Sequence, residues 1–141
     1  MAKRHKIRIK GPREIERMRV AGAAASSILR QVAAAVQPGM STRELDELAG
    51  ELIRENGCKS AFLGYRGFPG QTCLSVNEEV VHGIGGPRRI QPGDIIKIDV
   101  GVVKNGWIGD NATTVAVGEV AVETKRLLKA TEESLYAAID K

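Results

Sequence analysis

The chain has 141 residues, enough for one domain or part of one, and an ordinary apolar fraction of 43%. It contains no apolar run long enough to cross a membrane. The charged N-terminus has no apolar segment behind it, so we expect no secretory signal peptide. Cys58 and Cys73 lack CxxC spacing, so we expect free thiols and a cytoplasmic protein.

The formal net charge is +4, and basic residues crowd the first thirteen positions. Such a cluster can contact nucleic acid or an acidic surface. However, no aromatic residues interleave the charges, and Ile7 and Ile9 alternate with basic residues as in a short edge strand. We interpret residues 1–11 as a basic, solvated segment and do not expect nucleic acid as a partner. The basic side chains are Lys3, Arg4, His5, Lys6, Arg8, Lys10 and Arg13.

Two helices are predicted in the first part of the chain. The first begins at Pro12 and ends before Pro38-Gly39. Its helically spaced positions include small residues where a neighbour can approach closely: Ile15, Met18, Gly22, Ala25, Leu29, Val32 and Val36. The second follows a capping box of Ser41 and Glu44 and ends at Asn56-Gly57. Its apolar stripe consists of Leu45, Leu48, Ala49, Leu52 and Ile53.

The middle of the chain alternates between loops and extended stretches. The predicted order is a glycine-rich loop, a strand, an extended stretch and a polar loop, over residues 58–71, 72–76, 79–82 and 83–93. The first loop contains Phe62, Tyr65 and Phe68. These aromatic residues either line an apolar pocket or close over the core.

The most informative segment is a predicted hairpin over residues 93–117. Both arms are rich in Ile, Val and Thr, and Asn105-Gly106 is the standard pair for a two-residue turn whose central residues need positive φ. This turn places Asp99 opposite Ala112, with Asp110 two residues along on the same face. The other face suits a core, with Ile96, Ile98, Val100 and Val102.

Asp99 and Asp110 are therefore candidate metal ligands. Diagonal neighbours on a sheet lie roughly 7–8 Å apart, so two carboxylates there can bridge metal ions held about 3.5–4 Å apart. The alternative is a half-exposed hairpin with two solvated acids. His82, at a strand-to-loop transition, is either a further ligand, a substrate contact or an ordinary loop histidine. One His and two Asp suit Zn, Mn, Fe or Co, but cannot saturate two metals.

A third helix is predicted from Thr124 to the end of the sequence. Its apolar face consists of Leu127, Leu128, Thr131, Leu135, Ala138 and Ile139. The order helix, helix, strands, hairpin and helix predicts an α+β architecture, in which helices cover one face of a mainly antiparallel sheet.

Several phrases of the sequence are similar to the type I methionine aminopeptidases. They are Met18-Arg19-Val20-Ala21-Gly22, Pro38-Gly39-Met40-Ser41-Thr42-Arg43-Glu44-Leu45-Asp46, Gly64-Tyr65-Arg66-Gly67-Phe68-Pro69, Ser75-Val76-Asn77-Glu78-Glu79-Val80-Val81-His82-Gly83-Ile84, Pro92-Gly93-Asp94-Ile95-Ile96-Lys97-Ile98-Asp99 and Gly109-Asp110-Asn111. The resemblance covers nearly the whole chain. It implies the pita-bread fold, two similar α+β halves related by a pseudo-two-fold axis, with residues 12–141 forming the amino-terminal half.

The resemblance also implies a site. Asp99 and Asp110 match two of the family's five ligands to a dinuclear centre of Mn, Fe, Co or Zn, which acts as Lewis acid and generates the nucleophile. His82 matches a catalytic histidine that contacts the scissile peptide without binding metal. Arg66 stands where some members have histidine. Three further positions match residues that line the pocket for the methionine side chain: Tyr65, Phe68 and Cys73.

The family's other ligands, one His and two Glu, come from a second half that these residues do not include. We therefore expect weak or absent metal binding and impaired removal of N-terminal methionine from peptides or nascent chains, unless a second half completes the site. The phrase His82-Gly83-Ile84-Gly85 matches the ligand-histidine phrase of that second half, which indicates a possible homodimer. The alternative is a non-catalytic half-domain that folds or dimerises, with weak or no metal binding.

Overall fold

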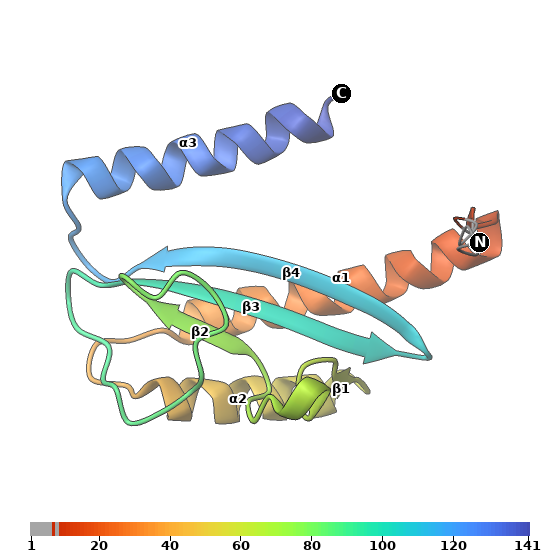
Figure 1. Cartoon of the computed structure of the whole chain (residues 1–141), viewed down its shortest axis with the longest axis horizontal. Helices are drawn as coiled ribbons and strands as arrows, with labels where there is room; N and C mark the ends of the chain where they lie inside the picture. Colours follow the sequence, from red (N-terminus) through yellow and green to blue (C-terminus); the bar gives the residue numbers. More distant parts are fainter. Residues whose placement is uncertain (1–6, 8) are drawn as a thin grey trace, which may run out of the picture.

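The computed structural model describes residues 7 and 9–141, and Figure 1 shows the arrangement of the elements. The helices are α1 (Pro12–Ala35), α2 (Thr42–Glu55) and α3 (Val122–Ile139), with a short 3-10 turn η1 (Tyr65–Gly67). The strands are β1 (Lys59–Ser60), β2 (Cys73–Val76), β3 (Ile95–Lys104) and β4 (Trp107–Ala116). The three long helices, β2 and the hairpin confirm the corresponding sequence predictions.

Strand β3 is the centre of an antiparallel sheet. β4 pairs along one edge of β3, whereas β1 and β2 pair with different parts of the other edge. The turn between β3 and β4 is the predicted one, because Asn105 and Gly106 have φ of 51° and 81°. The register pairs Asp99 with Ala112 and Gly101 with Asp110. Both aspartates therefore lie on one face of the sheet, as predicted.

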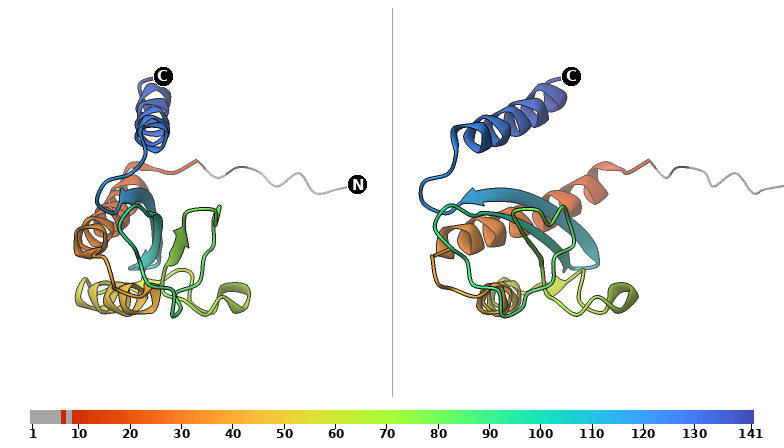
Figure 2. Two further views of the ribbon diagram at one scale, coloured as in Figure 1. Left: turned by 90° about the vertical axis from the view of Figure 1, so that its left-hand side faces the viewer. Right: turned by 60° about the vertical axis from the view of Figure 1, so that its left-hand side comes forward.

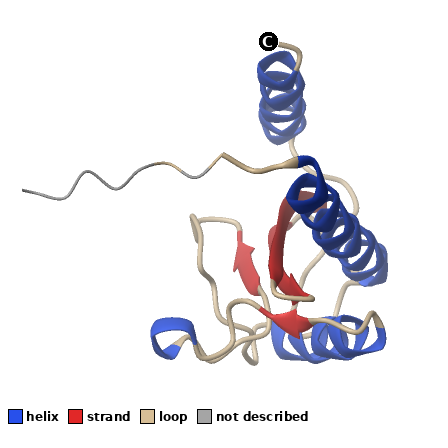
Figure 3. Ribbon diagram, turned by 90° about the vertical axis from the view of Figure 1, so that its right-hand side faces the viewer, coloured by secondary structure: helices blue, strands red, loops and turns tan. Residues whose placement is uncertain are grey.

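The opposite face of the sheet carries the core. Ile96, Ile98, Val100 and Val102 are fully buried, as predicted. Helices α1 and α2 cover this face, as Figures 2 and 3 show from two sides. Their buried apolar residues include Ala25, Ile28, Leu29, Val32, Leu45, Ala49 and Ile53. Because burying one aliphatic side chain stabilises by about 1.5–3 kcal/mol, this layer accounts for much of the packing energy.

Helix α1 approaches β4 closely at Gly109. A Cβ atom added to Gly109 would lie 2.1 Å from the carbonyl oxygen of Ala21. The close approach thus depends on Gly109 of β4 and on the helix backbone at Ala21, whereas the side-chain position of Gly22, which the sequence suggested, meets no neighbour. A backbone carbonyl cannot move aside as the end of a side chain can.

Gly109→Ala is expected to lower the free energy of unfolding by about 1–3 kcal/mol, because the methyl group would push α1 away from β4. Gly22→Ala is the matched control, because a Cβ at Gly22 meets no atom within 4 Å. That control is expected to stabilise by about 0.5–1 kcal/mol, as alanine favours the helix. Urea unfolding of both variants checks this, and equal effects would contradict the close approach.

The third helix forms but does not cover the sheet. No residue of α3 is buried, and apolar side chains such as Leu127, Leu135 and Ile139 remain about 60% exposed. Figures 1 and 2 show α3 projecting away from the layers formed by the sheet, α1 and α2. The prediction that helices cover one face is therefore confirmed for α1 and α2, and wrong for α3.

Three other local predictions need correction. The extended stretch predicted over residues 79–82 pairs with no other strand, and it is wrong at His82, which has the left-handed φ of 58°. Residues 58–71 are not only a loop, because Lys59 and Ser60 pair with β3. The edge strand expected around Ile7 lies partly outside the described residues, and none forms at residues 7, 9 and 10. Within the part of the chain that the structure describes, no helix has the length and apolar character needed to span a membrane.

Candidate metal centre

The two aspartates lie on the open face of the sheet. Asp110 and Ala112 on β4 are exposed, so none of the described elements covers this part of the face. Asp99, on the central strand, is partly buried between β4 and Cys73, its partner on β2. The two carboxyl groups therefore stand side by side at the border between the packed sheet and solvent.

The carboxyl group of Asp99 is suited to a cation. Among the described residues its Oδ1 is the buried side-chain oxygen that has no hydrogen-bond partner. The pKa of Asp99 is raised from 3.8 to about 6 by burial, by the negative charge of Asp110 and by hydrogen bonding with Asp110. The charge of His82 acts in the opposite direction and lowers this pKa. An unsatisfied buried oxygen beside a second carboxylate is costly, and a divalent ion would satisfy both.

Cys73 lies beside Asp99 and is buried. Burial, followed by the charges of Asp99, Asp46 and Asp110, raises the pKa of the Cys73 thiol to about 11. The thiol is therefore neutral at physiological pH and packs as a small apolar group. It is not a strong nucleophile, because that reactivity belongs to the thiolate.

His82 is exposed and close enough for its positive charge to lower the pKa of Asp99. Among the described residues, however, no group of three or more His, Cys, Asp or Glu side chains is placed to hold a metal ion. The three-residue ligand set of His82, Asp99 and Asp110, which the residue types alone allowed, is therefore not assembled. The backbone at His82 is left-handed, with a φ of 58°, and turns the chain at this point.

The loop after His82 is fixed against β2 through Gly83. The amide of Leu74 donates to the Gly83 carbonyl at 2.9 Å, and the amide of Gly83 donates to Ser75 Oγ at 3.0 Å. A Cβ on Gly83 would lie 2.1 Å from the Leu74 carbonyl oxygen. Only glycine permits this contact, which sets where His82 stands relative to the sheet.

The first turns of α2 hold the other side of the loop. Gly86 donates its amide to Thr42 Oγ1 at 2.9 Å and accepts from the Arg43 amide at 2.9 Å. A Cβ on Gly85 would lie 2.8 Å from Asp46 Cβ. Gly83 and Gly85 thus allow the loop to pack closely against β2 and α2.

Asp46 also fixes the start of β2. Its carboxylate accepts from the amides of Gln71 and Thr72 at 3.0 and 2.8 Å, and from Thr72 Oγ1 at 2.7 Å. Sequence reasoning missed Asp46 and Thr42 as supporting residues. The available signal was weak, since both are polar residues within an amphipathic helix and their partners lie far along the chain.

Asp46→Ala is expected to lower the free energy of unfolding by about 1–3 kcal/mol, because it leaves the fully buried Thr72 without its partner. Glu47→Ala is the control, since Glu47 is exposed on the same helix. The control is expected to change stability by less than about 0.5 kcal/mol. Thermal or urea unfolding measures both, and similar values would show that the Asp46 hydrogen bonds contribute little.

The aromatic residues of the glycine-rich loop separate into two environments. The rings of Phe62 and Phe68 pack edge to face at 6.5 Å, and Phe62 lies over Gly101, where a Cβ would be 2.4 Å from its ring. Tyr65 is 64% exposed and stacks under the Arg66 guanidinium at 5.5 Å. Phe62 therefore closes over the sheet beside the aspartates, whereas Tyr65 faces solvent in this half.

Comparison with known proteins places this arrangement in a class. The profile of metallopeptidase family M24 matches residues 16–141, and the chain belongs to that family. The chain is 46% identical over 130 residues to methionine aminopeptidase 1 of Bacillus subtilis, which covers 92% of this chain and 52% of the relative. It therefore spans about half the length of the curated relatives it matches.

Solved structures agree with the sequence comparison. The methionine aminopeptidase of Thermotoga maritima superposes with a TM-score of 0.91 at 43% identity, covering 95% of this chain and 54% of the other. The methionine aminopeptidase of Rickettsia prowazekii superposes with a TM-score of 0.90 at 35% identity, covering 93% of this chain and 53% of the other. A prolidase from Pyrococcus furiosus, at 22% identity and a TM-score of 0.71, shares the fold alone. The fold is thus α+β, half of the pita-bread fold, as the resemblance implied.

Proposed function

We propose that this chain supplies one half of a dinuclear aminopeptidase site that removes N-terminal methionine from peptides or nascent chains. Asp99 and Asp110 are two of its metal ligands. The observation that carries this assignment is the buried, unpartnered Oδ1 of Asp99 beside the carboxylate of Asp110 on an open sheet face. The similarity to methionine aminopeptidases supports the substrate class.

The remaining roles follow from position. Asp99 and Asp110 would provide part of the ligand set for a divalent metal pair of Mn, Fe, Co or Zn, which would supply Lewis-acid and water-activating chemistry at the peptide carbonyl. His82 contacts the scissile peptide from the loop held by Gly83. Cys73, as a buried neutral thiol, provides apolar surface for the methionine side chain, together with Phe68 and Tyr65. The exposed Tyr65 becomes part of the pocket when a second half faces this surface.

The site requires completion, because two carboxylates cannot saturate a metal pair. We propose that a second copy, related by two-fold symmetry, or another chain covers the open face, and that the isolated half is impaired. The proposed domain is residues 12–141, preceded by the basic segment 1–11. The free, buried thiols of Cys58 and Cys73 support a reducing compartment, the cytoplasm.

A non-catalytic half-domain is the second candidate. The observation favouring it is that the described residues contain no group of three or more potential ligands placed for a metal. In this case the chain folds or dimerises and binds metal weakly or not at all.

Light scattering and a peptide assay distinguish these candidates. Solution mass is measured on metal-free protein and after adding Mn(II) or Co(II), and release of methionine from a Met-Ala peptide is followed in parallel. A dimer strengthened by metal, with turnover lost in Asp110→Asn, is the expected result. Metal uptake that Asp110→Asn abolishes, without turnover, favours the half-domain. A monomer that neither binds metal nor turns over peptide contradicts the composite site.

A further inference from the structure

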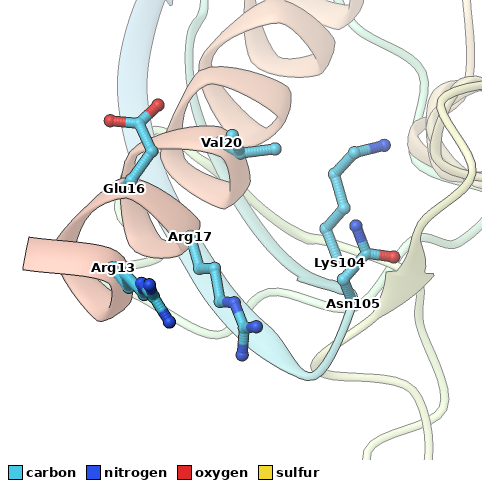
Figure 4. Close-up of a pocket in the computed structure, with 6 residues that line it drawn as sticks. All are labelled: Arg13, Glu16, Arg17, Val20, Lys104 and Asn105. Carbon is cyan, nitrogen blue, oxygen red and sulfur yellow. The ribbon is translucent and has the colours of Figure 1, made fainter.

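A second surface feature lies at the turn of the hairpin, whereas the two aspartates lie in the middle of its strands. The first two turns of α1 and the turn between β3 and β4 enclose a groove of about 340 Å³. Figure 4 shows its lining side chains, Arg13, Glu16, Arg17, Val20, Lys104 and Asn105. This groove plays no part in the proposed peptidase function.

The positive charges of the groove lie on one side of α1. Figure 4 shows the guanidinium groups of Arg13 and Arg17 on the same side of α1, one helical turn apart, with the Glu16 carboxylate pointing away from them. Glu16 pairs instead with Arg19 at 3.4 Å. Within the described residues no carboxylate lies in ion-pair range of Arg13 or Arg17, and both are exposed.

Lys104 has a different part in the groove. Its ammonium group donates to the carbonyl of Asn56 at the end of α2, so the charge stabilises that helix terminus. The alkyl chain of Lys104 then forms a wall opposite α1. The cations free to meet a ligand are thus the two arginines.

The positive charge of the chain is concentrated in its first twenty residues, to which Arg13 and Arg17 of the groove belong. The first twenty residues contain eight Lys or Arg and two Glu, which gives +6, whereas the whole chain has +4. The remaining 121 residues therefore carry −2. An excess of positive charge in one part of a sequence favours binding to polyanions.

We infer that the groove binds the phosphate backbone of a nucleic-acid strand without reading its bases. The guanidinium fork matches phosphate oxygens, and two such forks one helical turn apart, about 5–6 Å between Cβ atoms, can hold successive phosphates. Val20 is the one apolar residue in the lining, and no aromatic ring is present there for base stacking. The sequence alone did not favour nucleic acid, because no aromatic residues interleave the basic ones, whereas contacts to the phosphate backbone need no aromatic residue.

Fluorescence anisotropy with a labelled uridylate RNA of about 20 nucleotides tests the inference. Binding is expected to weaken steeply between about 50 and 200 mM salt. The double variant Arg13→Glu/Arg17→Glu is expected to bind at least about tenfold more weakly, with the salt slope reduced by about 1.4, or 0.7 for each lost phosphate contact. A thymidylate DNA of equal length is expected to bind similarly, because the bases are not read.

The control is Arg30→Glu/Arg126→Glu, which makes the same change in net charge at exposed helical positions outside the groove. It is expected to retain RNA binding within about twofold. Circular dichroism checks that both double variants fold, which we expect because all four arginines are exposed. Equal losses in both double variants would overturn the groove as the site. Binding to phosphatidylglycerol vesicles but not to RNA would overturn the nucleic-acid ligand.

Discussion

Replacing Asp99 by asparagine is expected to make the metal-free chain more stable at pH 7, although Asp99 lies in the centre of the sheet. Burial and the Asp110 charge raise the pKa of Asp99 to about 6, so ionising this carboxyl is unfavourable in the folded state. Asparagine has nearly the same shape and no charge. Its amide can also donate to the Asp110 carboxylate.

The direction of the pH dependence follows from linkage. Because the folded pKa of about 6 lies above the unfolded value of 3.8, the contribution of Asp99 to stability is full below pH 3.8 and is lost as the pH rises through about 6. Solvent screening of this partly exposed group reduces the loss to about 1–2 kcal/mol. Asp99→Asn is expected to gain that amount at pH 7 and nothing near pH 3.5, in urea unfolding with a chelator present.

Adding metal is expected to make the wild-type chain more stable than Asp99→Asn, the reverse of the order without metal. Under the proposed assignment, Mn(II) at a hundred times its dissociation constant stabilises the wild-type chain by about 2.7 kcal/mol, whereas Asp99→Asn loses this gain. Asp140→Asn, at the exposed end of α3, removes one charge elsewhere and is expected to behave as wild type in both respects. Destabilisation of Asp99→Asn at pH 7 without metal, or equal stabilisation of all three proteins by Mn(II), would contradict the assignment.

Local chemistry made the hairpin predictable. Asn105-Gly106 determines the turn type, and the turn determines the register of the two strands. The register in turn places Asp99 and Asp110 on the same face of the sheet. The prediction needed no information from distant residues. The same holds for α2, where the Ser41 and Glu44 capping box forms as expected.

Long-range contacts explain what could not be predicted. The helix α3 has a clear amphipathic pattern, but the pattern does not say which surface it packs on, and here it packs on none of the described elements. The residues around His82 looked extended, yet contacts of Gly83 with β2 and of Gly85 with α2 impose an irregular path. Asp46 joins α2 to residues 25 and 26 positions away along the chain, a link that no spacing rule shows.

Gly83→Ala is expected to be among the most damaging small substitutions in this chain. The φ of Gly83 is accessible to alanine, so the obstacle is steric rather than conformational. The added methyl group would collide with the Leu74 carbonyl, and the hydrogen bonds to Leu74 and Ser75 would break as the loop moves away. We expect a loss of about 2–4 kcal/mol in the free energy of unfolding.

Gly86→Ala is the matched control in the same loop. The nearest atom to a Cβ at Gly86 is 3.8 Å away, and its amide can still donate to Thr42 Oγ1. Its stability is expected to change by less than about 1 kcal/mol.

Trypsin cleavage then reports on the loop, because Arg88 and Arg89 lie within it and Arg88 is held by Glu79 at 2.9 Å. Faster cleavage of Gly83→Ala than of Gly86→Ala is expected, since a detached loop opens more often. If both variants unfold and are cleaved like wild type, the packing of Gly83 against β2 does not hold His82 in place.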